Sequence, residues 1–87
     1  MKHAGQASLD RLETMLDQLR GFDGITERKR GIFYQKSKAF LHFHEDDADL
    51  FCDVRLAHDA DFERFPVTTF RQQQDVLKRV KQALRHA

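Results

Sequence analysis

The sequence predicts an α+β fold, a two-layer sandwich in the order helix, four or five antiparallel strands, helix, with both helices on one sheet face. Two observations predict it. Apolar residues recur at helical spacing near each end of the chain, and residues 25–56 hold strand-like runs separated by short polar turns. An 87-residue chain has room for one domain with a modest core. We therefore expect a single domain over 1–87, ordered from about 8 to 85.

The first helix is predicted from Ser8 to Leu19, because leucines recur there along one helical face. These leucines are Leu9, Leu12, Leu16 and Leu19. We expect Ser8 to cap the start of the helix. We expect Gly21 to end it in the left-handed conformation that glycine adopts readily.

The strands are predicted between the helices. Three runs have strand character, at 31–35, 38–45 and 50–56. Residues 26–30 extend the first strand or form another, and 62–67 add a short edge strand ended by Pro66. The turns between the three central runs fall at Lys36-Ser37 and at 46–49.

The second helix is predicted from Phe70 to Arg85. Its buried side is expected to carry a set of apolar residues spaced as on one helical face. These are Phe70, Leu77, Val80 and Leu84, flanked by Val76 and Ala83. Thr69 followed by Gln72 matches a capping box, in which each residue satisfies a free N–H group at the start of the helix.

Two tight turns predict which strand residues share a face, because side chains alternate along a strand. The first turn places Tyr34 opposite Ala39 and Phe33 opposite Phe40. The second turn places the strand 38–45 opposite 50–56. One face then collects apolar residues and is expected to lie under the helices: Ile32, Tyr34, Ala39, Leu41, Phe43, Cys52, Val54 and Leu56. The opposite face collects Phe33, Lys38, Phe40, His42, His44, Phe51, Asp53 and Arg55.

This second face, called the open face below, mixes aromatic and ionisable residues, which is typical of a surface that contacts a partner. The main hypothesis is a non-enzymatic binding or interaction domain. Its candidate ligand-binding residues are Phe33, Phe40, His42, His44, Phe51, Asp53 and Arg55. A homodimer could bury this face, with its three phenylalanines at the centre and its charged groups at the rim.

A second hypothesis is a site for a divalent metal or a small ligand, centred on His42, His44 and Asp53. Two histidines that lie two apart on a strand point the same way and can bind one ion. Asp53 lies across from His42 and could be a third ligand, or could orient His42 by a hydrogen bond. The simpler interpretation is a cross-strand pair between His42 and Asp53 that only stabilises the sheet.

Catalysis and nucleic-acid binding are less favoured by the same residues. His42 and Asp53 could form an acid–base dyad, but no nucleophile accompanies it, because Cys52 belongs to the core face. The basic run 28–30 could contact nucleic acid beside the aromatic residues. However, 15 basic and 14 acidic residues leave a net charge of +1, which is not typical of a dedicated nucleic-acid binder.

The composition also predicts where the protein is found. The sequence has no apolar run of the roughly 18 residues that a membrane span needs. Residues 1–8 lack the apolar stretch of a signal peptide. A single cysteine fits a reducing compartment. We therefore expect a cytoplasmic protein, in which the terminal His3 and His86 are disordered and take no part in the site.

The segments 38–46 and 50–56 resemble a short bacterial family known as the luciferase domain. That family shows a His-x-His-Gly-Asp stretch, an Asp-Val-Arg-Leu-like stretch and a closing helix, and Glu45 stands here in place of its glycine. Residues 24–27, the Lys-Ala-Phe strand and the last helix are also similar to the YjbR-like group of small α+β proteins. These resemblances imply a sheet-and-helix fold and importance for His42, His44, Asp53 and Arg55, without implying a reaction. The YjbR-like resemblance also implies possible nucleic-acid contact.

Overall fold

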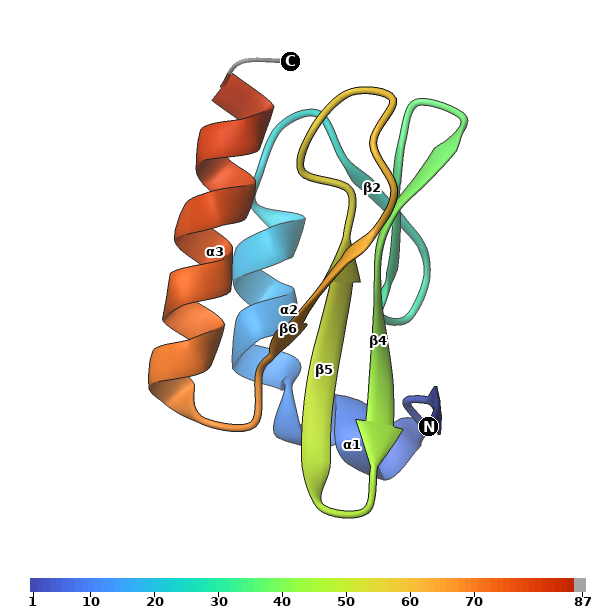
Figure 1. Cartoon of the computed structure of the whole chain (residues 1–87), viewed down its shortest axis with the longest axis vertical. Helices are drawn as coiled ribbons and strands as arrows, with labels where there is room; N and C mark the ends of the chain where they lie inside the picture. The colour runs from blue at the N-terminus through green and yellow to red at the C-terminus, as the bar shows by residue number, and fades with distance from the viewer. Residues whose placement is uncertain (86–87) are drawn as a thin grey trace.

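A computed structural model describes residues 1–85 of the chain and confirms the α+β fold class (Figure 1). The elements, in chain order, are β1 (Lys2–His3), α1 (Gln6–Arg11), α2 (Glu13–Arg20), β2 (Thr26–Lys29), β3 (Ile32–Gln35), β4 (Lys38–Asp46), β5 (Asp49–Val54), β6 (Glu63–Pro66) and α3 (Phe70–Arg85). The strands form one antiparallel sheet in the order β2-β3-β4-β5-β6, and β1 pairs with β4. His86 lies outside the described residues.

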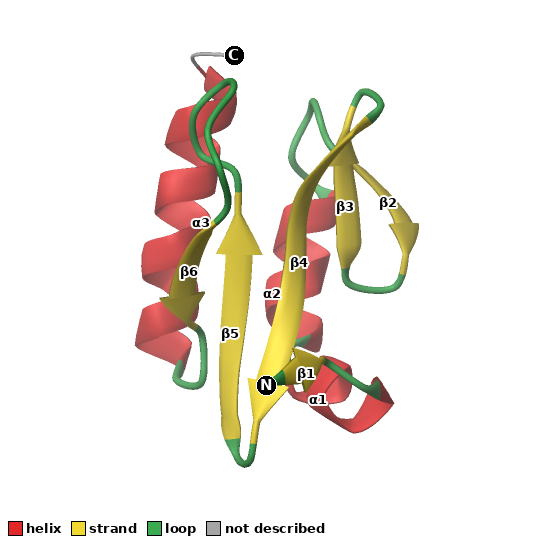
Figure 2. Ribbon diagram, turned by 45° about the vertical axis from the view of Figure 1, so that its right-hand side comes forward, coloured by secondary structure: helices red, strands yellow, loops and turns green. Residues whose placement is uncertain are grey.

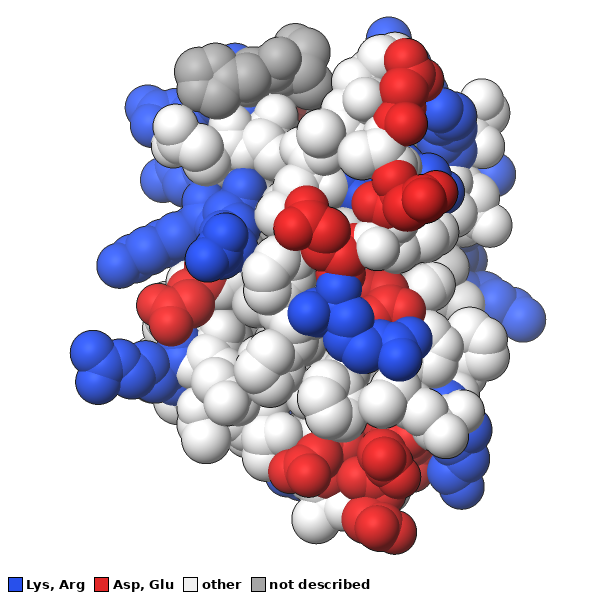
Figure 3. Space-filling view, viewed as in Figure 1, with Lys and Arg blue, Asp and Glu red and all other residues white. Residues whose placement is uncertain are grey.

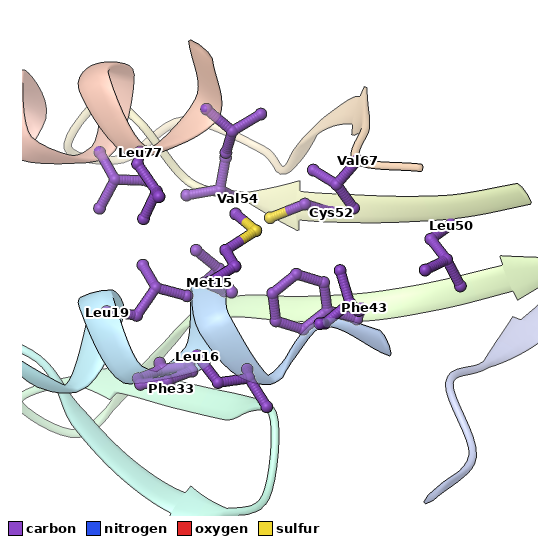
Figure 4. Close-up of a cluster of buried hydrophobic side chains, with 14 of the residues drawn as sticks. Met15, Leu16, Leu19, Phe33, Phe43, Leu50, Cys52, Val54, Val67 and Leu77 are labelled. Atoms are coloured by element: carbon purple, nitrogen blue, oxygen red, sulfur yellow. The ribbon is translucent and has the colours of Figure 1, made fainter. Parts of the chain in front are cut away.

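The helices α2 and α3 lie side by side against one face of this sheet, and the core fills the space between the two layers (Figures 1 and 2). Leucines of the N-terminal helical region meet valines of α3 and apolar residues of the central strands. The core residues that Figure 4 labels are Met15, Leu16, Leu19, Phe33, Phe43, Leu50, Cys52, Val54, Val67 and Leu77. Burial of such apolar surface is the main driving force for folding.

The predicted N-terminal helix is broken in two at Leu12, whose backbone (φ −98°, ψ 5°) leaves the helical range. The prediction that Ser8 caps the helix is wrong, since Gly5 is the N-cap and Ser8 lies buried inside α1. Glu45 of β4 supports this end instead, because its Oε1 accepts hydrogen bonds from Gly5 N (2.7 Å) and Ser8 Oγ (3.0 Å). The C-cap Gly21 is right-handed (φ −83°), which corrects the left-handed prediction.

The helix α3 matches its predicted bounds and its predicted cap. Thr69 N donates to Gln72 Oε1 (3.0 Å), and Gln72 N donates to Thr69 Oγ1 (3.1 Å), which is the reciprocal pair of a capping box. The expected burial of Phe70 is wrong, because this side chain at the start of the helix is 67% exposed. Val76, Leu77 and Val80 form the buried side.

The pairing of β4 with β5 follows the predicted register residue by residue. Leu41 lies opposite Val54, His42 opposite Asp53, and Phe43 opposite Cys52. The turn is tighter than predicted, because Asp46 and Asp49 still pair and leave only two residues between the strands. This register holds because Leu41, Phe43, Cys52 and Val54 alternate toward the helices, where all four are buried.

The pairing of β3 with β4 departs from the prediction at a β-bulge. Tyr34 pairs with Ala39 as predicted, but Phe33 pairs with Leu41, so Phe40 is the extra residue. Phe33 therefore lies on the core face, 1% exposed, and packs among core residues (Figure 4). Phe40 also belongs to the core cluster, 2% exposed.

The bulge corrects both predicted faces. Phe33 and Phe40 leave the open face, on which the sequence alone had placed them. Since side chains alternate along a strand, the neighbours of Phe33 point away from the helices, and Ile32 and Tyr34 are accordingly only half-buried. Ala39 shares the face of its partner Tyr34. The open face therefore loses two phenylalanines.

The structure decides how the two edge strands pair, which the sequence did not determine. Strand β2 forms a hairpin with β3, and β6 pairs with β5. Arg20 of α2 ties the first hairpin to the helix layer, because its Nε donates to Glu27 Oε1 (2.6 Å). Glu27 Oε2 in turn accepts from Gly31 N (2.8 Å) in the turn between β2 and β3.

Candidate metal centre on the open face

Two histidines of β4 and one aspartate of β5 form the centre of the open face. His42 and His44 lie two residues apart on β4 and therefore project to the same side. Asp53 lies opposite His42 in the sheet register, as predicted. One potential ligand atom from each of the three residues lies within 4.8 Å of the others. The sheet alone thus brings together the three predicted metal ligands.

The carboxylate of Asp53 is held by Arg64 of β6. The Asp53 side chain is 9% exposed, and its two oxygens accept hydrogen bonds from Arg64 Nε (2.7 Å) and Nη2 (2.8 Å). This guanidinium lowers the pKa of Asp53, against the opposing effect of burial. Asp53 is therefore an ionised carboxylate at neutral pH, and only the lone pairs away from Arg64 are left for another partner.

The two histidines have unused ring nitrogens. Within residues 1–85, neither the buried Nδ1 of His42 nor that of His44 has a hydrogen-bond partner. The Nδ1 of His44 lies 3.3 Å from Asp53 Oδ2, but the alignment is not that of a hydrogen bond. Burial lowers the pKa of both imidazoles, which favours the neutral form that binds metals.

His3 belongs to this site, contrary to the expectation for a terminal histidine. Strand β1 places it opposite His44, and the two rings stack at a centroid distance of 4.5 Å. The His3 ring also lies 5.8 Å from that of His42. The sequence offered no signal for this contact, because a two-residue strand has no periodicity to read.

Phe62 and Arg55 close the side of the site near the loop between β5 and β6. The ring of Phe62 stacks on His42 at 4.7 Å, and the guanidinium of Arg55 lies 4.2 Å from the centre of the Phe62 ring. Arg55 also donates to the backbone oxygens of Ala39 (3.2 Å) and Ala60 (2.7 Å). The structure thus places Arg55 as a tie between β4 and the loop, beside the histidines.

The remaining predicted residues divide between the open face and the core. Phe51 lies opposite His44 on the open face and is half-buried. Cys52 is fully buried, and burial raises the pKa of its thiol, which fits the prediction that it is not a reactive nucleophile. Arg64 and Phe62 are functional candidates that the sequence did not indicate, since a long loop precedes β6 and no tight turn sets its register.

Charges of both signs are spread over the open face, which Figure 3 shows from the sheet side. Acidic side chains gather at the end that carries the β4–β5 turn, and basic side chains gather along α3 (Figures 1 and 3). No continuous basic surface covers this view of the sheet. Among residues 1–85, no helix combines the length and the apolar composition needed to cross a bilayer.

Comparisons with protein-family models, curated proteins and solved structures gave no match to this chain. The resemblances to the luciferase-domain family and to YjbR-like proteins therefore stay predictions.

Proposed function

We propose that this protein is a binding domain that holds one divalent transition-metal ion on its open face, with His42, His44 and Asp53 as ligands. One observation carries the proposal. Within residues 1–85, the buried Nδ1 atoms of His42 and His44 have no hydrogen-bond partner, and one ring nitrogen of each histidine lies within 4.8 Å of the ionised, nearly buried carboxylate of Asp53. Buried polar atoms are normally satisfied, so such a group needs an explanation, and a metal ion would supply one.

The donor set indicates which ion would bind. Two imidazoles and one carboxylate suit Zn²⁺ and its neighbours Ni²⁺ and Cu²⁺, whereas Mg²⁺ and Ca²⁺ prefer oxygen ligands. Around tetrahedral zinc, ligand atoms about 2.1 Å from the ion are about 3.4 Å apart. The 3.3 Å between His44 Nδ1 and Asp53 Oδ2 already has this spacing. His42, whose candidate ligand atom lies within 4.8 Å of the other two, would complete the site.

A non-enzymatic role is part of the proposal. Three protein ligands leave a coordination position for a fourth group, which lets the metal connect this face to a partner molecule. The acid–base dyad considered above is not supported by the contacts, because the carboxylate of Asp53 pairs with Arg64 and approaches His44. A cytoplasmic location, with Cys52 as a free buried thiol, completes this proposal.

Zinc titration tests the proposal. Calorimetry should give one site per chain, and the ring resonances of His42 and His44 should shift together in NMR spectra. The double variant His42→Asn, His44→Asn should lose this site. His58→Asn is the matched control, because that side chain is 88% exposed and lies outside the cluster. Equal zinc affinity in the double variant and the wild type would place the metal elsewhere and refute the proposal.

A homodimer is a separate proposal, and the open face offers less apolar surface for it than the sequence predicted. Of the three phenylalanines predicted at its centre, Phe51 alone lies on the open face, and it is half-buried. Sedimentation of Phe51→Asp tests this interface. A wild-type dimer that becomes a monomer in the variant would support it, and an unchanged mass would contradict it.

A further inference from the structure

A second candidate site lies at the end of the molecule away from the β4–β5 turn. An open hollow of about 1400 Å³ lies there between α3, the loop after α2, the β3–β4 turn and the loop after β5. These four segments gather at the same end of the molecule (Figures 1 and 2). None of the three proposed metal ligands lines the hollow, although Arg55, which contacts Phe62 beside the histidines, borders both sites.

The β-bulge explains why the hollow exists. Strands β4 and β5 stay paired up to Leu41 and Val54, and the bond from Arg55 N to Phe40 O (2.9 Å) continues the contact by one step. Beyond the bulge, β4 bends away toward β3, and the chain after β5 turns the other way (Figure 2). Phe40, Leu56 and other apolar side chains of this region line the opening.

The walls of the hollow are basic. Lys36 and Lys38 come from the β3–β4 hairpin, and Lys78 and Arg79 come from α3 on the other side. Asp23 is the one acidic residue among the described residues that line it. The contact of Lys38 with Asp59 is long, at 3.6 Å between two exposed side chains, and leaves the lysine available.

We propose that this hollow binds an acidic, amphipathic segment of a partner protein. Its apolar lining would receive hydrophobic side chains, and its two basic walls would attract flanking carboxylates. Its volume exceeds the roughly 300–1000 Å³ of typical small-molecule pockets, which favours a peptide over a metabolite. The positive charge is local, because the whole chain carries a net charge of only +1.

The test uses a fluorescein-labelled peptide of about 14 residues made of Glu, Ala and Leu, with its leucines on one helical face. Fluorescence anisotropy should show binding that weakens with added salt. Amide resonances of Ser37 and Ala83 should shift in NMR spectra, while those of the metal centre should not. The same peptide with Lys in place of Glu should fail to bind.

Charge reversal tests the walls. Lys36→Glu with Lys78→Glu should weaken peptide binding by at least about tenfold, because one repulsive charge then stands on each wall. Lys29→Glu with Lys81→Glu is the matched control, since it changes the net charge equally with two exposed lysines outside the hollow. Equal weakening by both pairs, or amide shifts elsewhere, would overturn the proposal. Binding of dodecanoate but not of the peptide would also overturn it, in favour of an anionic amphiphile.

Discussion

Replacing Arg64 with methionine tests how much the pair of Arg64 and Asp53 stabilises the metal-free protein. Arg64 donates two hydrogen bonds of 2.7 and 2.8 Å to Asp53, whose side chain is 9% exposed. Breaking a fully buried ion pair costs about 3–5 kcal/mol. Because the Arg64 side chain is 46% exposed, water can replace part of the loss. We therefore expect the free energy of unfolding to fall by about 2 kcal/mol.

Urea denaturation followed by circular dichroism measures this loss. With a slope of about 1–1.5 kcal/mol per molar urea for a small domain, the midpoint should fall by about 1.5 M. Arg64→Lys keeps the charge but loses the paired hydrogen bonds, so its urea midpoint should lie between those of Arg64→Met and the wild type. Arg71→Met removes an exposed arginine of α3 and should change stability by less than about 0.5 kcal/mol.

Zinc at saturating concentration should more than offset the loss in Arg64→Met. Removing the guanidinium frees both oxygens of Asp53 and removes a positive charge beside the proposed ion, so zinc affinity should rise by at least about tenfold. Zinc at 100 times the dissociation constant of the variant would then stabilise the variant by about 2.7 kcal/mol, and the same zinc concentration would stabilise the wild type, with its at least tenfold weaker site, by at most about 1.4 kcal/mol. Equal stabilisation of Arg64→Met and the wild type by zinc would show that Asp53 is not a ligand.

Three further predictions concern the fold. Phe33→Ala should cost about 3–4 kcal/mol in chemical denaturation because Phe33 is 1% exposed, whereas Phe70→Ala, at 67% exposed, should cost less than about 0.5 kcal/mol. A cost below about 1 kcal/mol for Phe33→Ala would contradict the burial of Phe33 in the core and indicate that this residue lies on the open face. Gly31→Ala should lower the free energy of unfolding by about 2 kcal/mol, because φ is +79° and the new Cβ would lie 2.7 Å from a methyl group of Leu9 in α1. Gly21→Ala, at φ −83°, should leave the stability nearly unchanged. Equal melting temperatures for the two glycine variants would contradict this. Arg20 of α2 lowers the pKa of Glu27. The pair of Arg20 and Glu27 therefore stabilises the fold above the usual pKa of 4.5, and this stabilisation is lost as the pH falls through the lower pKa of Glu27 in the folded state. Glu27→Gln should accordingly lose less melting temperature than the wild type on acidification from pH 7 to pH 3, and parallel curves would refute the assignment.

The local pattern of the sequence determined α3 and the pairing of β4 with β5. The capping box at Thr69 and Gln72 and the helical spacing of Val76 and Val80 are short-range features, which read the same in any tertiary context. The alternation in β4 and β5 has one register that buries Leu41, Phe43, Cys52 and Val54 together, so His42 was correctly placed opposite Asp53.

The tertiary structure decided what surrounds that pair. A bulge at Phe40 adds one residue to one strand and moves Phe33 into the core, and no local residue pattern predicted it. Arg64 and His3 reach the open face from strands that are distant in sequence, with no tight turn to fix their register. The sequence alone therefore determined the two histidines and the aspartate as neighbours. Packing across long loops decided which side chains hold the aspartate, cover the histidines and open the basic hollow, because those contacts depend on how the layers fit and not on the spacing of residues.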